Sequence, residues 1–115
     1  MEEKCLFCDI IQKNIPAKIV HESEHVLAFH DIRPQAPVHI LIIPKEHIAT
    51  LNDIKSEHQN IIGEMFLVAN KLAKDFGFSE KGYRTIFNCN HDAGQDVYHI
   101  HLHLLAGRRF HWPPG

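Results

Sequence analysis

The stretch His99-Ile100-His101-Leu102-His103 alternates imidazole and aliphatic side chains. On a β-strand successive side chains point to opposite faces, so this alternation predicts one histidine face and one apolar face. The three rings would then lie about 6 to 7 Å apart along one groove. An ordinary amphipathic strand with histidines toward solvent is the alternative interpretation. Near pH 7 an imidazole can act as a nucleophile or bind phosphate, so the groove indicates phosphoryl chemistry.

The rest of the chain predicts an α+β fold with about five strands in a mainly antiparallel sheet, one short helix and one long helix. The short helix is expected over residues 5–13, before the helix-breaking Pro16. The long helix is expected from an N-cap at Ser56 to Gly77. Both helices are expected on one face of the sheet. The strands are expected over residues 18–22, 25–30, 38–43, 83–90 and 98–106, with a polar loop over 91–96.

Composition and charge limit the classes of protein that this chain can represent. A length of 115 residues with 44% hydrophobic and 23% charged residues is typical of one domain, expected over residues 1–115. The net charge of −2 gives no support for binding nucleic acid or an anionic membrane. The longest apolar runs, such as residues 39–43, are too short to cross a bilayer, and residues 1–4 lack the basic region of a signal peptide. A cytoplasmic location is therefore expected.

Cysteines and histidines are the candidate metal ligands. The set of three cysteines argues against a disulfide framework, and Cys5-x-x-Cys8 fits either half of a metal site or a redox pair. No thioredoxin-like βαβ pattern surrounds that pair, and Cys89 is expected to be a packed residue. The histidines at positions 21, 25, 39, 58, 91 and 111 are expected to be ordinary surface groups, although His39 lies on the strand beside the triad.

Beyond the alternation itself, the run from His99 to Leu105 resembles the His-φ-His-φ-His-φ-φ signature of the histidine-triad (HIT) superfamily. Other segments resemble its nucleotide-binding Hint branch, so the resemblance covers essentially the whole chain: Ile15–Lys18, Leu27–Ile32, Pro34–Pro37, Ile43–Ile48, Gly94-Gln95, Ala106–Arg108 and His111–Gly115. The resemblance implies a HIT-like fold and the hydrolysis of purine nucleoside 5′-phosphoramidates, such as AMP joined to an amine. It implies no organic cofactor.

The resemblance also implies catalytic roles. The middle histidine, His101, would attack the α-phosphorus and form a nucleotidyl-histidine intermediate that water then resolves. His103 and the backbone around Gly94 and Gln95 would hold the phosphoryl oxygens, with help from Asn88.

Binding of the nucleoside is implied for a second group of residues. Asp31 would accept hydrogen bonds from the ribose hydroxyls, and His30 would lie at the mouth of the same pocket. The base would lie in an apolar slot, for which plain core is the alternative interpretation: Leu6, Phe7, Ile10, Phe29 and Ile32.

Asp96 is a departure from the family pattern, because the Hint branch commonly carries serine at this position after Gly-Gln. An ionised Asp96 would repel phosphate, whereas a protonated one could act as the acid for the departing amine. A turn-forming role is the favoured interpretation. The departure keeps open a catalytically weak, nucleotide-binding regulatory module as an alternative function.

Relatives in the superfamily also imply a metal site and a dimer. Cys5, Cys8, His47 and His99, the last also a triad member, would bind a structural zinc ion, because four protein ligands leave no open coordination position. The family is usually a homodimer, in which the tail 107–115 with Trp112 reaches toward the partner's active site. Hydrolysis of dinucleoside polyphosphates, which needs a deeper cationic channel, is a further alternative.

Overall fold

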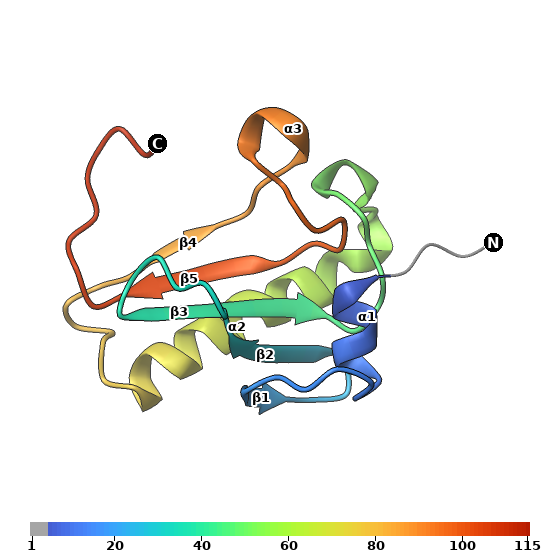
Figure 1. The fold of residues 1–115 in the computed structure, drawn as a ribbon, viewed down its shortest axis with the longest axis horizontal. Coiled ribbons are helices and arrows are strands. Elements are labelled where there is room, and N and C mark those ends of the chain that lie inside the picture. The colour runs from blue at the N-terminus through green and yellow to red at the C-terminus, as the bar shows by residue number, and fades with distance from the viewer. Residues whose placement is uncertain (1–4) are drawn as a thin grey trace.

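The computed structural model describes residues 5–115 and has an antiparallel sheet of five strands at its centre. The sheet order is β1-β2-β3-β5-β4, so the last strand in the chain lies inside the sheet, between β3 and β4 (Figure 1). The fold class is as the sequence predicts. The strands span Ile19–Glu22 (β1), Val26–His30 (β2), Val38–Pro44 (β3), Arg84–Ile86 (β4) and Leu102–Ala106 (β5).

Three α-helices and two short 3₁₀ turns complete the described residues. The long helix α2 is preceded by a 3₁₀ turn over Ser56–His58, so it begins later than the N-cap expected at Ser56. No helix among residues 5–115 has the length and apolar character needed to cross a membrane. The helices span Leu6–Ile11 (α1), Gln59–Asp75 (α2) and Asn90–Ala93 (α3), and the 3₁₀ turns span Leu51–Asp53 and Ser56–His58.

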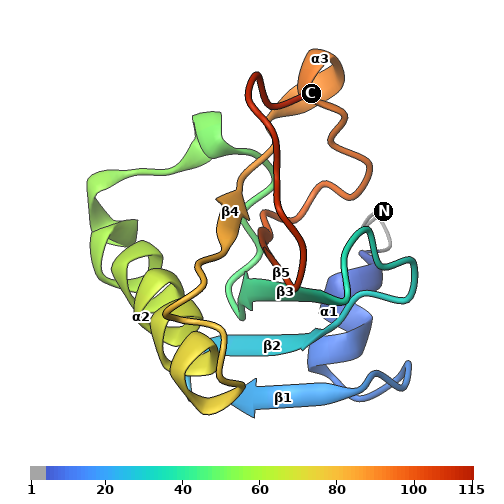
Figure 2. The same ribbon diagram turned by 90° about the vertical axis from the view of Figure 1, so that its left-hand side faces the viewer.

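Helices cover both faces of the sheet, and the expectation that they share one face is wrong. Alternate residues of β2 and β3, such as Ala28 and Ile42, pack on α2, whereas Phe29 and Leu41 pack with α1 on the other face. The two helices accordingly lie on different sides of the strands in Figure 2. Nearly continuous apolar runs, as in β2, are typical of strands that are buried on both faces.

The two C-terminal strands are shorter than the sequence predicts. β4 ends at Ile86 and β5 begins only at Leu102. Between them the expected polar loop contains α3, which is bounded by left-handed backbone at Asn90 (φ 66°) and Gly94 (φ 82°). A strand cannot continue through such residues, so the hairpin ladder cannot extend across this loop.

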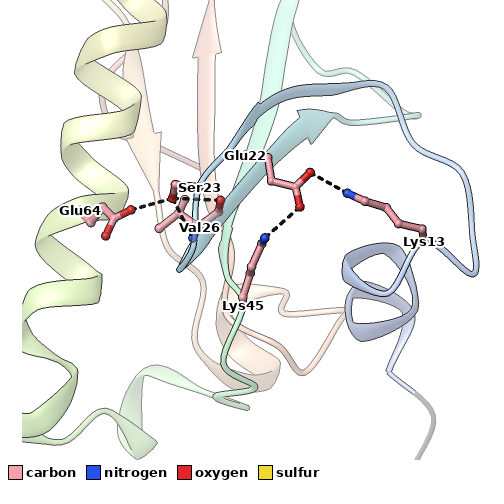
Figure 3. A network of polar contacts seen from close by, with 6 residues as sticks. All are labelled: Lys13, Glu22, Ser23, Val26, Lys45 and Glu64. Carbon is pink, nitrogen blue, oxygen red and sulfur yellow. Dashed lines mark hydrogen bonds and ion pairs between the residues drawn. The ribbon is translucent and has the colours of Figure 1, made fainter.

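An ion-pair network fixes the first hairpin to the elements around it (Figure 3). Glu22 accepts hydrogen bonds from Lys13 at 2.7 Å and from Lys45 at 2.8 Å. These two lysines lower the pKa of Glu22 to about 2. Ser23 donates to Glu64 of α2 at 2.8 Å. The network therefore joins the exit of α1, the end of β3 and the long helix.

Candidate active site

The three histidines of the triad lie in and immediately before β5, but they do not share one groove. Only His103 lies in the strand, where it pairs with Leu41 on β3 and Ile86 on β4. The rings of His101 and His103 are neighbours, with centroids 4.9 Å apart. The ring of His99 instead lies against His47, with centroids 5.0 Å apart. His99 and His101 are buried and His103 is partly buried.

Backbone carbonyls determine which nitrogen of His99 and His101 carries the proton. His101 Nδ1 is 2.8 Å from the carbonyl oxygen of His99, and His99 Nε2 is 2.8 Å from the carbonyl oxygen of Pro44. A carbonyl oxygen only accepts, so each of these nitrogens is the donor. In the neutral rings, His101 Nε2 and His99 Nδ1 are therefore left with free lone pairs, as a nucleophile or a metal ligand requires.

His39 extends the cluster and determines the tautomer of His103. The backbone N–H of Gln35 donates to His39 Nδ1 at 3.0 Å, so a neutral His39 carries its proton on Nε2. That nitrogen lies 2.9 Å from His103 Nδ1 and donates to it. His103 is then left with a proton on Nε2, which makes it a hydrogen-bond donor on its other side. The sequence predicts an ordinary surface group at His39, and this prediction is wrong because the side chain is buried.

Low solvent exposure keeps the rings of His39, His99 and His103 neutral at pH 7. Burial lowers the pKa of His103 to about 4, and repulsion from His101 and His39 adds to this effect. Burial likewise lowers the pKa of His99 to about 4 and lowers the pKa of His39. The histidines that surround His101 therefore add no positive charge beside it at this pH.

A cavity of about 340 Å³ opens beside His101 and His103. Its wall includes the ring of Phe7, which meets Phe29 edge-on with centroids 5.6 Å apart. His30 lines it too, although its ring stacks on Phe76 at the end of α2. The lining contains these predicted site residues: Leu6, Phe7, Ile10, Phe29, His30, Asp31, Ile32, Asp96, His101 and His103.

Asp31 lies at the polar end of this apolar cavity. Its Oδ1 accepts a hydrogen bond from the backbone N–H of Arg33 at 2.7 Å. Its Oδ2 lies 3.5 Å from His39 Nε2. Oδ1 of this carboxylate is therefore occupied by the Arg33 N–H, whereas Oδ2 lies between the cavity and the histidine cluster.

The loop before the triad is held together by the buried side chain of Gln95. Its Nε2 donates to the carbonyl oxygens of Ala49 at 2.8 Å and Val97 at 3.1 Å, and its Oε1 accepts from Asn90 N at 2.8 Å. The N–H groups of Gly94 and Gln95 donate to carbonyl oxygens within the same loop. These groups are therefore used in shaping the loop.

Asp96, the next residue in the loop, faces the candidate nucleophile. Its Oδ1 is 3.9 Å from His101 Nε2, and its side chain is 85% exposed. An exposed carboxylate can turn into water, so this distance does not require the charge to stay beside a bound phosphate.

A second cavity, of about 730 Å³, lies on the other side of His103. Its lining includes His39 and two residues predicted for the nucleotide site, Asn88 and Trp112. The structure thus divides the predicted site residues between two cavities that share His103.

Cys5, Cys8, His47 and His99 come together with their ligand atoms all within 4.8 Å of one another. The Sγ–Nδ1 distances are 3.4 Å for Cys5–His99, 3.5 Å for Cys8–His47 and 3.6 Å for Cys8–His99, and the two Nδ1 atoms are 3.2 Å apart. A tetrahedral zinc ion would need about 3.6 Å between sulfur and nitrogen and about 3.3 Å between nitrogens. Both the chemistry and the spacing of these donors fit zinc.

A second group, Asp31, His39 and His103, is equally close-packed but does not fit a metal ion. His39 would have to bind the ion through Nε2, which would place the remaining proton of a neutral ring on Nδ1. That proton would face the N–H of Gln35, which already donates to Nδ1. The hydrogen-bonded arrangement is therefore the stable one.

Comparison with known proteins adds independent information about this site. The family model described as HIT domain matches residues 12–110. A purine nucleoside phosphoramidase of Escherichia coli is 52% identical over 108 residues, covering 94% of this chain and 91% of the relative. A crystal structure of a HIT family hydrolase from Legionella pneumophila superposes with a TM-score of 0.96 at 56% identity, covering 97% of this chain and 100% of that one. A histidine triad nucleotide-binding protein from Candida albicans superposes with a TM-score of 0.82 at 33% identity, covering 97% and 85%.

Proposed function

Because the chain belongs to the HIT family, we propose that it is a hydrolase that cleaves the P–N bond of purine nucleoside 5′-phosphoramidates. The observation that carries this proposal is the tautomer of His101. Its Nδ1–H donates to the carbonyl oxygen of His99, so the lone pair of Nε2 is free beside an apolar cavity. The relative named purine nucleoside phosphoramidase supports the choice of substrate.

In the proposed first step, His101 Nε2 attacks the phosphorus atom and the P–N bond breaks. The electron pair of that bond goes to nitrogen, which takes a proton from water and leaves as an amine. The ring becomes positively charged when Nε2 is bonded to phosphorus, and the carbonyl oxygen of His99 stabilises that charge through Nδ1–H. Water then attacks phosphorus, the N–P bond breaks, and the nucleoside monophosphate is released with a proton.

The phosphoryl oxygens need donors that are already in position. His103 Nε2–H is such a donor, because His39 holds the opposite nitrogen of the ring. The amide of Asn88 completes this part of the proposal, whereas the N–H groups of Gly94 and Gln95 act by holding the loop in shape. Once the departing amine has taken up a second proton from water, the nearby carboxylate of Asp96 can pair with the resulting ammonium group.

The nucleoside is proposed to lie in the 340 Å³ cavity. Its apolar lining, with the edge of Phe7 and the ring of Phe29, suits a purine base. The Oδ2 atom of Asp31 is proposed to accept hydrogen bonds from the ribose hydroxyls.

Zinc is proposed as a structural ion held by Cys5, Cys8, His47 and His99. When bound, it supplies no reaction chemistry, because these residues fill a tetrahedral site. His99 donates through Nε2 to Pro44, which leaves Nδ1 for the ion and fixes the ring. The ion would join α1 to the segment before β5, and α1 carries part of the proposed nucleoside pocket.

A homodimer in the cytoplasm is the proposed state of the protein. Phe66 and Leu67 are exposed apolar side chains on α2, and Phe66 packs against Phe87, the residue that follows the edge strand β4. Trp112, in the tail 107–115, is 82% exposed and is proposed to reach the partner's site. Analytical ultracentrifugation tests this part, because a monomer at micromolar concentration would contradict it.

Hydrolysis of an adenosine 5′-phosphoramidate tests the proposed activity. We expect turnover by the wild type, none by His101→Ala, and AMP binding by both. His25→Ala, at a largely exposed histidine, is the matched control and should keep wild-type turnover. AMP binding without turnover in the wild type would contradict the proposal and would favour a regulatory binding module.

A further inference from the structure

The larger cavity adjoins the reaction centre on the side away from the nucleoside pocket. His103 lines both cavities, and the larger one has a volume of about 730 Å³. Attack on phosphorus expels the leaving group on the side opposite the nucleophile. A phosphoryl group held by His103 can therefore place the nucleoside in the smaller cavity and the leaving group in the larger one. The nucleoside is proposed for the smaller cavity, so the larger cavity has no ligand assigned to it.

Two arginines in the lining of this cavity have no carboxylate partner among residues 5–115. Arg84 and Arg108 both line it, and both guanidinium groups lie over the ring of Phe110, at 5.3 and 4.3 Å from its centroid. Among residues 5–115, no carboxylate lies within 4.0 Å of either guanidinium. The N–H groups of these guanidiniums that do not donate to the protein are therefore available to an anion.

Backbone contacts hold the two arginines in place. Arg84 Nη1 donates to the carbonyl oxygen of His111 at 3.1 Å. Arg108 Nε donates to the carbonyl oxygen of Gln35 at 3.1 Å. Each group keeps further N–H donors after these bonds, because a guanidinium has five. These bonds therefore define the positions of both guanidinium groups before any ligand binds.

The register of the sheet sets the distance of Arg84 from the reaction centre. Ile86 pairs with His103, and Arg84 pairs with Leu105. Paired residues share a face, so Arg84 lies on the same face as His103 and two residues along the strand, a separation of about 7 Å. An anionic group a few bonds from the scissile nitrogen would span that distance.

We propose that the larger cavity binds the leaving group and selects amines that carry an anionic group, either a carboxylate or a phosphate. The inference rests on the proposed hydrolysis of phosphoramidates. The reaction is unchanged: the P–N bond breaks, nitrogen keeps the electron pair and takes a proton from water, and the amine departs with its anionic group. Arg84 and Arg108 bind that group, and Phe110 orients both guanidiniums.

Two substrates that differ only in charge provide the test. Adenosine 5′-phosphoramidates of β-alanine and of β-alaninamide have the same length, but one ends in a carboxylate and the other in a neutral amide. We expect the wild type to have a kcat/KM about tenfold higher for the carboxylate. A third substrate, made from phosphoethanolamine, distinguishes phosphate from carboxylate as the preferred anion.

Three single variants assign the preference to residues. We expect the ratio of kcat/KM between carboxylate and amide to fall about fivefold in Arg84→Gln and about threefold in Arg108→Gln. Arg109→Gln removes the same charge from the tail outside the lining of the cavity and should keep the wild-type ratio. Because each ratio compares two substrates on one preparation, a loss of folded protein cancels.

The outcomes separate this inference from the proposed function. Hydrolysis of all three substrates with no preference for an anion, or an equal ratio in all variants, would overturn the inference and leave the phosphoramidase activity standing. Hydrolysis of none of them would overturn the proposed function and the inference with it.

Discussion

The ring of Phe7 meets the ring of His101 edge-on, with centroids 5.0 Å apart and an angle of 85° between the planes. Phe7 lies in α1, between the proposed metal ligands Cys5 and Cys8. It also contacts the ring of His99, with centroids 5.9 Å apart. One aromatic side chain thus connects the metal cluster to the candidate nucleophile.

Removal of the metal is expected to disturb both stability and nucleotide binding. Cys8→Ser, or treatment with a strong chelator, should lower Tm by about 10 °C, because metal binding contributes directly to folding free energy. It should also raise KM, since α1 lines the nucleoside pocket. Metal analysis and calorimetry measure the first effect. Cys89→Ser is the control and should keep the metal content; purified wild type without bound zinc would contradict the assignment.

Loss of His39 is expected to reduce turnover without removing any group that contacts phosphorus. In His39→Ala the ring of His103 can adopt either tautomer, and kcat should fall by about 100-fold. His39→Gln should recover part of this loss, because its amide can accept from Gln35 N–H and donate to His103. Steady-state kinetics distinguishes the two variants. Equal activity in both would show that His39 contributes only packing.

Acid is expected to destabilise the folded protein through His103. Its pKa is about 4 in the folded state, against 6.5 for an unperturbed histidine. The unfolded chain therefore takes up the proton first, and the free energy of unfolding falls as the pH drops from about 6.5 to 4. After a discount for the partial exposure of the ring, the expected loss is about 2 kcal/mol. Urea unfolding at several pH values measures it, and His103→Asn should show a shallower dependence over the same range.

Gln95 is expected to be essential for the shape of the loop before the triad. Gln95→Ala removes three hydrogen bonds and leaves Asn90 N and two carbonyl oxygens without their partner, which should cost about 2 kcal/mol. Gln95→Glu keeps an acceptor but loses the donor, so it should be impaired as well. Gln12→Ala, at an exposed position, is the matched control. Thermal unfolding that is unchanged in Gln95→Ala would contradict this role.

Much of the fold and part of the site could be predicted from local pattern. The position of the long helix follows from helical periodicity, and those of β2 and β3 follow from apolar runs bounded by turn residues. The Cys5-x-x-Cys8 spacing indicated half of a metal site. The histidine alternation predicted a strand, but only His103 is in β5. Before Leu102 the backbone N–H of Ile100 donates to the carbonyl oxygen of Ile48, which lies outside the strands, and carbonyl oxygens hold the first two rings individually.

The remaining features depend on contacts between distant parts of the chain. His39 reaches His103 only because β3 pairs with β5, with Leu41 opposite His103. Arg84 and Arg108 meet over Phe110 because the tail folds back along β4. Neither arrangement produces a periodic pattern or a fixed residue spacing in the sequence, so local sequence patterns could not predict them.

The strand order has a consequence for the folding of the nascent chain on the ribosome. β5 is synthesised after all of its neighbours, yet it lies between β3 and β4. Until it emerges, β3 has an open edge, and the cluster around Cys5 lacks His99. The nascent chain therefore depends on a late insertion of β5. A stalled or truncated translation product would expose an aggregation-prone edge and would lack His101, the proposed nucleophile.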